Sequence, residues 1–407
     1  PGKGPLEGVV VLDLTRILAG PTCTQLLGDY GATVIKIERP GSGDDTRSWG
    51  PPYLPAADGG ESDQATYFMA ANRNKHSVAI DIAQEEGAAL VRRIALKADV
   101  VVENFKVGGL AKYGLDYPSL SAEHEGLIYC SITGFGQTGP YAKRAGYDFL
   151  AQGMGGIMSL TGEPDGEPVK AAVAVADLIA GMYSVTGILA ALHHRERTGE
   201  GQHIDVALLD SQISWLVGEG TGYLNTGVVP QRRGNAHASI VPYQVFEASD
   251  GHMILACGND GQFRRLCAVL GRPELADDPD YATNPARIRH REALVSILAV
   301  LIGAHTRDEL LALLEAQGVP AGPVNTLDQT FADPQVIHRD MRIEMPHPAA
   351  GSGRVALIGN PVKMSATPPS FRKAPPLLGA DTDAILQQWC SADARERDRL
   401  RKNRIIG

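Results

Sequence analysis

Residues 8–37 read GVVVLDLTRILAGPTCTQLLGDYGATVIKI. Within this stretch, Gly8–Leu14 and Thr33–Ile37 are apolar runs of strand length, typical of buried strands. Pro21–Tyr30 lies between them and predicts a helix, because proline is favoured in a first helical turn and Gly31 follows the last helical residue. A strand, a helix and a second strand in this order predict two parallel strands joined by a crossover helix.

The same alternation continues over the first part of the chain. His76–Ile82 predicts a strand, Gln84–Lys97 has the apolar spacing of a helix, and Asp99–Val102 and Leu127–Ile132 predict two more buried strands. We therefore expect an α/β fold whose large domain is a Rossmann-like open parallel sheet with helices on both faces. Ligands of such sheets bind beyond the carboxyl ends of the strands. Gly41–Gly60 is rich in glycine and proline and predicts a surface loop.

The pattern changes after a long predicted helix, Leu178–Glu196, which ends at the turn Thr198–Gly201. Tyr243–Phe246 and Met253–Ala256 flank a Ser-Asp-Gly turn and predict a β-hairpin. Helical patterns follow it, over residues 262–270, 285–302 and 306–317. These elements predict a smaller α+β domain. The expected organisation is a large domain at 1–215, a linker at 216–234, the small domain at 235–325, and a linker and return to the large domain at 326–407.

Composition excludes several classes of function. The chain has 407 residues, of which 43% are apolar and 21% charged, as in soluble globular proteins. A formal net charge of -9 argues against a nucleic-acid partner. We identify no apolar run of about 18 residues and no signal peptide before Gly8, so we expect no membrane partner and a cytoplasmic location. Five cysteines without a C-x-x-C pair predict reduced thiols.

The common cofactor and hydrolase motifs are missing from the sequence. The first predicted strand is followed by Ala19-Gly20-Pro21 and not by G-x-G-x-x-G, and there is no phosphate-binding loop, H-E-x-x-H or G-x-S-x-G. The histidines at 193, 194 and 203 are the only cluster of their kind. Adjacent histidines on a helix point in different directions, so we expect no metal site.

One carboxylate stands at a position suited to chemistry. In Ala171–Gly181 (AAVAVADLIAG), an apolar run meets Asp177 where a helical pattern begins. The free N–H groups and partial positive charge of a helix N-terminus would keep a carboxylate ionised at neutral pH, as a carboxylate nucleophile requires. The small residues around it leave room for a bulky ligand. An ordinary helix-capping aspartate would give the same local pattern, so both readings stay open here.

Nine short motifs, in this order and spacing, decide between those readings. They are Leu12-Asp13-Leu14, Ala19-Gly20-Pro21, Leu27–Ala32, Val34-Ile35-Lys36-Ile37-Glu38, Asn72-Arg73-Asn74-Lys75, Val102-Glu103-Asn104-Phe105, Thr133-Gly134-Phe135-Gly136, Ala176-Asp177 and Thr198–Gln202. Together they resemble the class III CoA-transferases, the family that includes formyl-CoA transferase and is related to α-methylacyl-CoA racemase. The resemblance runs over nearly the whole chain.

The resemblance implies a CoA-transferase with Asp177 as the nucleophile. It implies an interlocked homodimer, with coenzyme A or acyl-CoA as a substrate, a small carboxylic acid as its partner, and no permanently bound cofactor. Arg39 and Lys112 are expected to meet phosphates. Where some relatives carry lysine, this chain has Ala83. Carried over by position, the CoA-binding residues are Leu18, Ala19, Arg39, Ile80, Ala83, Asn104, Phe105, Lys106, Lys112, Thr133, Gly134 and Phe135.

Tyr147 separates the two chemistries of this superfamily. The racemase branch has a histidine base where this chain has Tyr147, and tyrosine is a poor base near neutral pH. Transfer is therefore favoured over racemisation of a 2-methylacyl-CoA, and a non-catalytic CoA-binding protein is the third reading. Tyr147 is expected either to contact the substrate or to serve packing.

The acyl substrate is expected to meet a loop in the second half of the chain. Gly234–Ser239 matches the glycine-rich loop of formyl-CoA transferase but lacks its four glycines. His237 and Ser239 are predicted to orient an acyl carboxylate, with a purely structural loop as the alternative. Residues 237–246 (HASIVPYQVF) resemble members that use succinyl-CoA and other dicarboxylates. Arg144 is the residue that we assign to the distal carboxylate.

Overall fold

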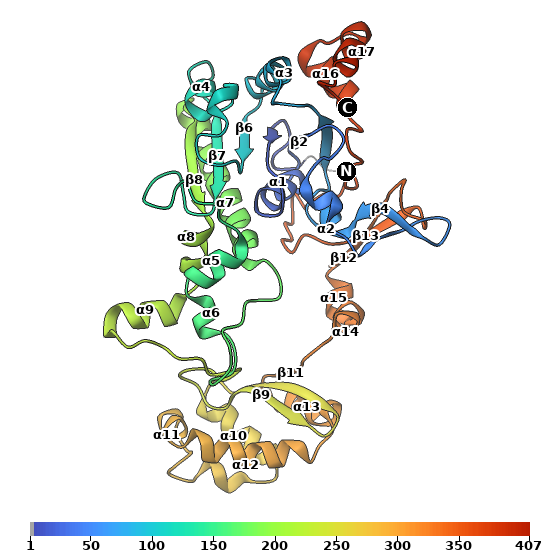
Figure 1. Cartoon of the computed structure of the whole chain (residues 1–407). Coiled ribbons are helices and arrows are strands. Elements are labelled where there is room, and N and C mark those ends of the chain that lie inside the picture. Colours follow the sequence, from blue (N-terminus) through green and yellow to red (C-terminus); the bar gives the residue numbers. More distant parts are fainter. Residues whose placement is uncertain (1–3) are drawn as a thin grey trace. The chain divides into compact units, whose positions relative to one another are not determined.

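The computed structural model describes residues 4–407 (Figure 1). These residues form two compact units. The large unit consists of residues 4–157, 170–227 and 335–407, and the small unit of residues 158–169 and 228–334. The chain therefore passes between the units four times.

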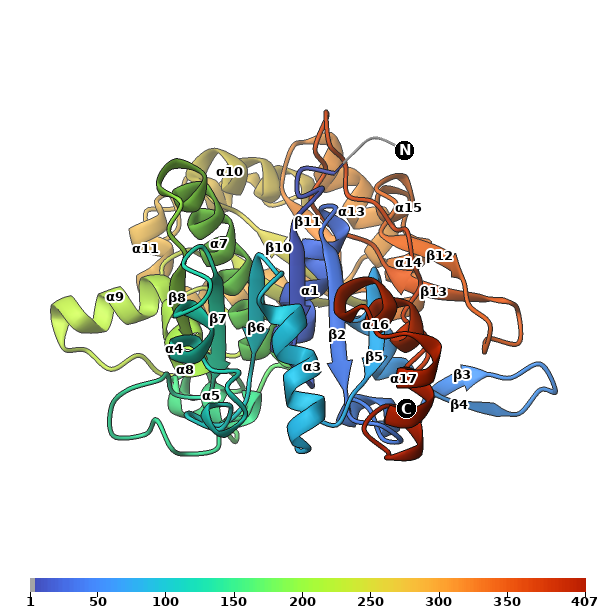
Figure 2. The same cartoon turned by 90° about the horizontal axis from the view of Figure 1, so that it is seen from above.

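Six strands of the large unit form one parallel sheet. They are β1 (Val10–Asp13), β2 (Thr33–Glu38), β5 (Lys75–Ala79), β6 (Val100–Glu103), β7 (Ile128–Thr133) and β8 (Gln202–Ala207). Their order across the sheet is β5-β2-β1-β6-β7-β8 (Figure 2). The chain winds outward from β1 in one direction through β2 and β5, and then in the other through β6, β7 and β8. The expected Rossmann-like parallel sheet is confirmed, and β1 and β6 flank its topological switch point.

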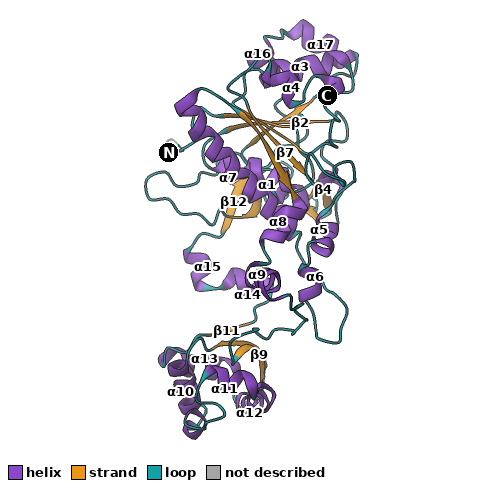
Figure 3. Cartoon of the chain, turned by 90° about the vertical axis from the view of Figure 1, so that its left-hand side faces the viewer, coloured by secondary structure: helices purple, strands orange, loops and turns teal. Residues whose placement is uncertain are grey.

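Helices cover both faces of this sheet, as expected. The helices of the large unit are α1 (Ala19–Asp29), α2 (Thr66–Ala70), α3 (Glu85–Ala95), α4 (Tyr117–Ser121), α5 (Asp148–Met154), α7 (Val175–Thr198), α8 (Leu208–Ser214), α9 (Val217–Thr226), α16 (Thr382–Cys390) and α17 (Ala394–Lys402), with short 3₁₀ turns at Asp45–Ser48 and Ala111–Tyr113. One apolar core lies between the sheet and α1 and α7; the other lies between the sheet and α3 and α16 (Figure 3).

Alternate side chains of each strand supply the two cores. Val11, Val34 and Val100 pack with α1 and α7, whereas Leu12 and Ile35 pack with α3 and α16. A strand buried on both faces reads as a continuous apolar run, which explains why residues 8–14 contain no polar position before Asp13.

Helix α7 corrects one sequence-based expectation. Among residues 4–407 it is the one helix long and apolar enough to cross a membrane, so the search for such a run should have found it. This is weak evidence for a membrane, because the core helix of a soluble protein passes the same test. Half of the apolar stretch is buried, and α7 packs along α1 in the core of the large unit.

Two small hairpins accompany the main sheet in the large unit. β3 (Tyr53–Pro55) pairs with β4 (Glu61–Ala65), and β12 (Arg342–Pro346) pairs with β13 (Arg354–Ile358). Gly41–Gly60 was expected to be a surface loop, and this is wrong in part, since it contains a 3₁₀ turn and β3. Strand β4 reads Glu-Ser-Asp-Gln-Ala, so it lacks the alternation of apolar and polar residues by which a strand is predicted from the sequence.

The small unit is built on a three-stranded antiparallel sheet of order β11-β10-β9. Its elements are β9 (Tyr243–Ala248), β10 (Gly251–Ala256), β11 (Ala321–Pro323), α10 (Asp260–Val269), α11 (Asn284–Arg289), α12 (Arg291–Gly303), α13 (Arg307–Ala316), α14 (Leu327–Ala332) and a 3₁₀ turn at Pro273–Ala276. The predicted hairpin is confirmed. The single helix expected over 285–302 is divided at His290 into α11 and α12.

Two short helices lie where the chain passes between the units. They are α6 (Ile157–Leu160) and α15 (Pro334–His338). Residues 216–234, expected to be a linker, contain α9.

Candidate active site

A pocket of about 680 Å³ lies at the carboxyl edge of the parallel sheet, inside the large unit. Its walls come from the segments that follow β1, β6 and β7, which leave the sheet on both sides of the switch point. The lining includes Ile17–Ala19 after β1, Asn104–Lys106 after β6, and Thr133–Gly134 at the end of β7. This is the edge where open parallel sheets bind ligands.

Asp177 is in the first turn of α7 and lines this pocket. Its side chain is 8% exposed. The helix that carries it packs closely against α1: a Cβ atom at Gly181 would lie 2.6 Å from the carbonyl oxygen of Ala19. Glycine is therefore required there, one helical turn after Asp177, and the close contact fixes the carboxylate beside the start of α1.

The pKa of Asp177 is raised from 3.8 to about 7, by burial first and by the nearby Asp148 carboxylate second. This corrects the expectation that a helix N-terminus keeps Asp177 fully ionised at neutral pH. The N–H groups at the start of α7 donate hydrogen bonds to a different residue, Asp148. The main-chain N–H of Ala176 donates to Oδ1 of Asp148 over 2.8 Å, and that of Asp177 donates to the same oxygen over 3.4 Å.

Asp148 is itself held in place by two features. The side-chain amide of Gln152, one turn further along α5, donates to its Oδ2 over 2.7 Å. The preceding Gly146 is in contact with Gly134, where a Cβ atom on either residue would lie 2.4 Å from the other's Cα. This backbone contact fixes the start of α5 against the end of β7.

The segment between β1 and α1 is clamped by Asn104. Its side-chain oxygen accepts the main-chain N–H of Arg16 over 3.0 Å, and its amide donates to the main-chain oxygen of Arg16 over 2.7 Å. Ile17 follows with a φ of +74°, which is unfavourable for a β-branched residue. Its N–H donates to Oδ1 of the buried Asp44 over 3.2 Å. Asn104 thus shapes the pocket wall, in addition to its predicted contact with CoA.

Cationic side chains surround the pocket. They are Arg16, Lys106, Lys112, Lys143 and Arg144. Arg16 pairs with Asp45 over 2.8 Å, and Arg144 lies over the ring of Tyr141 at 4.4 Å. The remaining lysines are available to a polyanionic ligand such as a nucleotide with several phosphates.

Ten of the predicted site residues line this one pocket. They are Leu18, Ala19, Asn104, Phe105, Lys106, Lys112, Thr133, Gly134, Tyr147 and Asp177. Tyr147 is 63% exposed, so it does not serve core packing within the chain. Arg144, assigned to a distal carboxylate, also lies in the lining.

Four predicted CoA-binding residues lie outside this lining. Arg39 and Ala83 are exposed at the ends of β2 and β5, and Phe135 packs edge-to-face on Tyr141. Ile80 is buried in the core and bridges to Ile406 near the end of the chain. For these four residues, CoA contact stays a prediction.

His237 and Ser239 belong to the small unit, where they form a local loop structure. The N–H of Ser239 donates to Nδ1 of His237 over 3.0 Å. Arg291 donates to the carbonyl oxygen of His237, and Asn284 donates to that of Ser239. Their proposed role toward an acyl carboxylate likewise stays a prediction.

Sequence reasoning did not identify several residues of the pocket. Asp45, Trp49 and Lys143 were not predicted, and neither was Asp148, which lies outside the lining but accepts N–H groups at the start of α7. Asp148 directly follows Tyr147 in the sequence, but nothing in the local pattern links it to Asp177. Among residues 4–407, no group of three or more His, Cys, Asp or Glu side chains could hold a metal ion.

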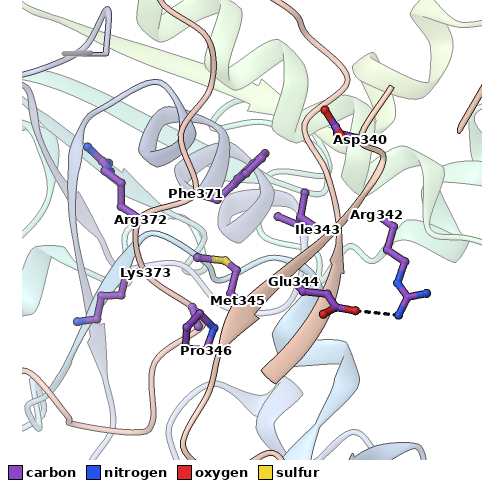
Figure 4. Close-up of a pocket in the computed structure, with 10 residues that line it drawn as sticks. Asp340, Arg342, Ile343, Glu344, Met345, Pro346, Phe371, Arg372 and Lys373 are labelled. Carbon is purple, nitrogen blue, oxygen red and sulfur yellow. Dashed lines mark hydrogen bonds and ion pairs between the residues drawn. The ribbon is translucent and has the colours of Figure 1, made fainter. Parts of the chain in front are cut away.

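A second pocket in the large unit, of about 690 Å³, lies between β12 and residues 371–374 (Figure 4). None of the predicted site residues lines it. Arg342 and Glu344 pair with each other at its edge over 2.9 Å. Arg372 donates to the carbonyl oxygens of Gly28, Gly31 and Ala32, so its guanidinium is already satisfied. The carboxyl edge of the sheet is therefore the better candidate.

Known proteins resemble this chain over nearly its whole length. The chain is 52% identical over 387 residues to a succinate–glutarate CoA-transferase of Agrobacterium fabrum, covering 95% of this chain and 96% of the relative. It is 44% identical to the mouse succinyl-CoA:glutarate CoA-transferase, over 99% of this chain and 90% of the relative. A CAIB/BAIF family protein from Brucella suis has a similar structure, with a TM-score of 0.86, 51% identity, and coverage of 95% of this chain and 100% of that one.

The family profile extends over most of the chain. Residues 6–382 match CoA-transferase family III, a span that includes the small unit, most of the large unit and every predicted site residue. Together with relatives at 44–52% identity, this match establishes that the chain belongs to the class III CoA-transferase family of enzymes.

Proposed function

We propose that the protein transfers CoA from succinyl-CoA to a dicarboxylic acid such as glutarate, through a covalent intermediate on Asp177. The observation that carries the proposal is a buried carboxylate lining a cation-rich pocket at the switch point of the sheet. Two relatives named for succinate or succinyl-CoA and glutarate, at 52% and 44% identity, support the choice of substrates.

The reaction proceeds by covalent catalysis in two halves. The Asp177 carboxylate attacks the thioester carbonyl, the C–S bond breaks, and a mixed anhydride and CoA thiolate form. The thiolate then attacks the Asp177 carbonyl and releases the donor acid as a carboxylate, leaving an aspartyl-CoA thioester. The acceptor carboxylate attacks this thioester, and the same steps in reverse yield the new acyl-CoA and free Asp177.

The pocket residues have separate tasks in this scheme. Lys106 and Lys112 bind the phosphates of CoA. The first N–H groups of α1, which no side chain caps, and that of Gly134 stabilise the oxyanions. The start of α7 does not contribute, because Asp148 accepts those N–H groups. Arg144 binds the distal carboxylate of the acyl group.

The enzyme is proposed to act as a homodimer in the cytoplasm. Helices α5, α7, α8 and α9 expose large apolar side chains in a pattern unusual for a monomer. They include Phe149, Leu150, Met154, Met182, Tyr183, Ile213, Tyr223 and Leu224. A second copy of the chain is the proposed occupant of this face, and the interlocked arrangement expected from the family is the proposed form. The five cysteines are buried as free thiols, which fits a reducing compartment.

The decisive test is to trap the acyl-aspartate. The protein is incubated with succinyl-CoA and hydroxylamine, digested and analysed by mass spectrometry. We expect a hydroxamate on the peptide carrying Asp177, and none in Asp177→Asn, which should still bind CoA. An unmodified peptide in the wild type, with a panel of other acyl-CoA donors also negative, would overturn the proposal.

Hydrogen exchange at the α-carbon of the substrate would distinguish a racemase from a transferase. Racemisation exchanges the α-proton of a 2-methylacyl-CoA with solvent, whereas transfer does not. In deuterium oxide we expect no wash-in at the α-carbon, because Tyr147 occupies the position where a second base is required. Deuterium incorporation at a rate comparable to turnover would favour the racemase.

A further inference from the structure

We propose that Asp148 is a positioning residue for Asp177: it holds the start of α7 and places a fixed negative charge beside the nucleophile, which favours the acylated form over the free carboxylate. The inference rests on the proposed role of Asp177 as nucleophile. It concerns a residue that does not itself bond to the substrate.

The geometry assigns Asp148 two functions at once. Its Oδ1 accepts the N–H groups of Ala176 and Asp177, at 2.8 and 3.4 Å, and so acts as a cap for α7 supplied by another helix. Its Oδ2 accepts the amide of Gln152, at 2.7 Å. Gln152 is fully buried, and its own oxygen accepts the N–H of Ala171 over 2.9 Å. Asp148 therefore cannot rotate away from Asp177.

The charge of Asp148 is not neutralised by a cation. Its three donors are neutral amides, and in the described part of the chain no Lys or Arg forms an ion pair with it. The charge of Asp148 therefore acts unfavourably on the buried Asp177 carboxylate whose helix it caps. In agreement, Asp148 contributes to the raised pKa of Asp177, although burial contributes more.

Other ionisable groups near Asp177 come from several elements. Tyr67 on α2 has a raised pKa, caused by burial first and then by Asp177 and Asp148. The cations that share the pocket with Asp177 are Arg16, Lys106, Lys112, Lys143 and Arg144. The residues of α1 next to Gly181 are neutral, and Asp210 of α8 is exposed. Among the acids of the described residues, Asp148 is thus the one that raises the pKa of Asp177.

The chemistry relieves this repulsion. Before reaction, Asp177 is a carboxylate with one negative charge. In the anhydride and in the aspartyl-CoA thioester it is neutral, because the charge has left with the thiolate and then with the donor acid. The repulsion from Asp148 thus raises the free energy of the free enzyme but not that of the acyl-enzyme. Asp148 should shift the internal equilibrium toward the covalent intermediate.

The matched variant is Asp148→Asn, which removes the charge while its amide oxygen can still accept the N–H groups of α7. We expect the acid limb of kcat/KM to move to lower pH by roughly half to one unit, and the fraction of aspartyl-CoA at a fixed succinyl-CoA concentration to fall roughly three- to tenfold. Asp210→Asn removes an exposed charge from α8 and should change neither quantity.

The possible outcomes separate this inference from the proposed function. If wild type forms no hydroxamate on Asp177, both proposals fail. If wild type is labelled, but Asp148→Asn has the same acid limb and the same acyl-enzyme fraction, only the role of Asp148 is overturned. A lower turnover with an unshifted acid limb would indicate a purely structural cap and would equally overturn the charge effect.

Should Asp148→Asn be too unstable for kinetics, urea unfolding at pH 8 gives an independent test. The cycle comprises wild type, Asp148→Asn, Asp177→Asn and the double variant. We expect Asp148→Asn to raise stability more, or lower it less, when Asp177 is ionised than when residue 177 is asparagine. Additive effects would show that the two carboxylates are not coupled and would contradict the inference.

Discussion

The proposed chemistry of Asp177 depends on how poorly the protein stabilises the charge of its carboxylate. A helix N-terminus would favour an ionised carboxylate, but here a second carboxylate takes the available N–H groups and burial removes water. Asp177 was identified from the sequence through a resemblance, because its local pattern also fits a capping residue. Asp148 was missed, because its closeness to Asp177 arises from the packing of α5 beside α7, which sequence spacing does not reveal.

The first prediction concerns the pH dependence of catalysis. In the proposed mechanism only the ionised form of Asp177 attacks the thioester, and burial raises the pKa of this carboxyl group to about 7. We expect kcat/KM to be constant above this value and to fall tenfold per unit below it, until binding effects intervene. A stopped assay with succinyl-CoA and glutarate from pH 5 to 9 checks this. An acid limb near pH 4 would show that Asp177 is not perturbed.

The same pKa predicts a stability effect of opposite sign to that of most aspartates. The pKa of Asp177 in the folded protein lies above the usual 3.8, so between pH 3.8 and 7 the folded protein binds more protons than the unfolded chain does. The contribution of Asp177 to the free energy of unfolding is therefore lost as pH rises through 7. Asp177→Asn removes the buried charge. We expect it to be more stable than wild type at pH 8, by about 1–4 kcal/mol, with the difference shrinking toward pH 5. Urea unfolding measured at both pH values provides the test.

The helices and strands could be predicted where apolar residues followed a helical spacing or formed one continuous run of strand length. Each strand of the parallel sheet up to β7 was found within a few residues, since burial on both faces makes these strands mostly apolar, although β2 and β5 also carry the buried polar residues Lys36, Lys75 and Ser77. The hairpin of β3 and β4 was missed, because β4 is polar and only its last residue is buried. The pocket wall between β1 and α1 could not be foreseen either, as its shape depends on Asn104, which comes from the far side of the switch point.

Asn104 therefore gives a prediction about binding. Asn104→Ala removes two hydrogen bonds that hold Arg16, each of them worth about 1 kcal/mol, so we expect KM for succinyl-CoA to rise roughly five- to thirtyfold with a smaller change in kcat. Asn104→Asp keeps the acceptor for the N–H of Arg16, so its KM should lie between that of wild type and that of Asn104→Ala. Initial-rate kinetics would contradict this view if both variants matched wild type.

The large unit, which consists of three separate stretches of chain, is held together by contacts between its first and last stretches. Asp29 on α1 accepts Arg73 over 2.6 Å and Asn360 over 3.0 Å, and all three side chains are buried. Arg73 also donates to the carbonyl oxygen of Ile358. The sequence predicted that the last segment returns to the large domain, but it contained no sign of these partners, because 285 and 331 positions separate them along the chain.

This buried ion pair yields a prediction about stability. Arg73→Met removes the cation and leaves Asp29 buried without its charge partner, which should lower the free energy of unfolding by about 3–5 kcal/mol. Arg264→Met breaks an exposed ion pair with Asp277 and should change it by less than about 1 kcal/mol. Denaturant unfolding of both variants compares them directly. Equal effects would mean that the Asp29 pair has no special role.

The four passages between the units have a consequence for synthesis on the ribosome. The small unit ends at residue 334, so its chain has fully emerged while the large unit still lacks residues 335–407. Until those residues appear, Asp29 and Arg73 lack Asn360 and the carbonyl of Ile358, and Ile80 lacks Ile406. The large unit begins before the small unit in the chain but obtains its last internal contacts only after the small unit is complete.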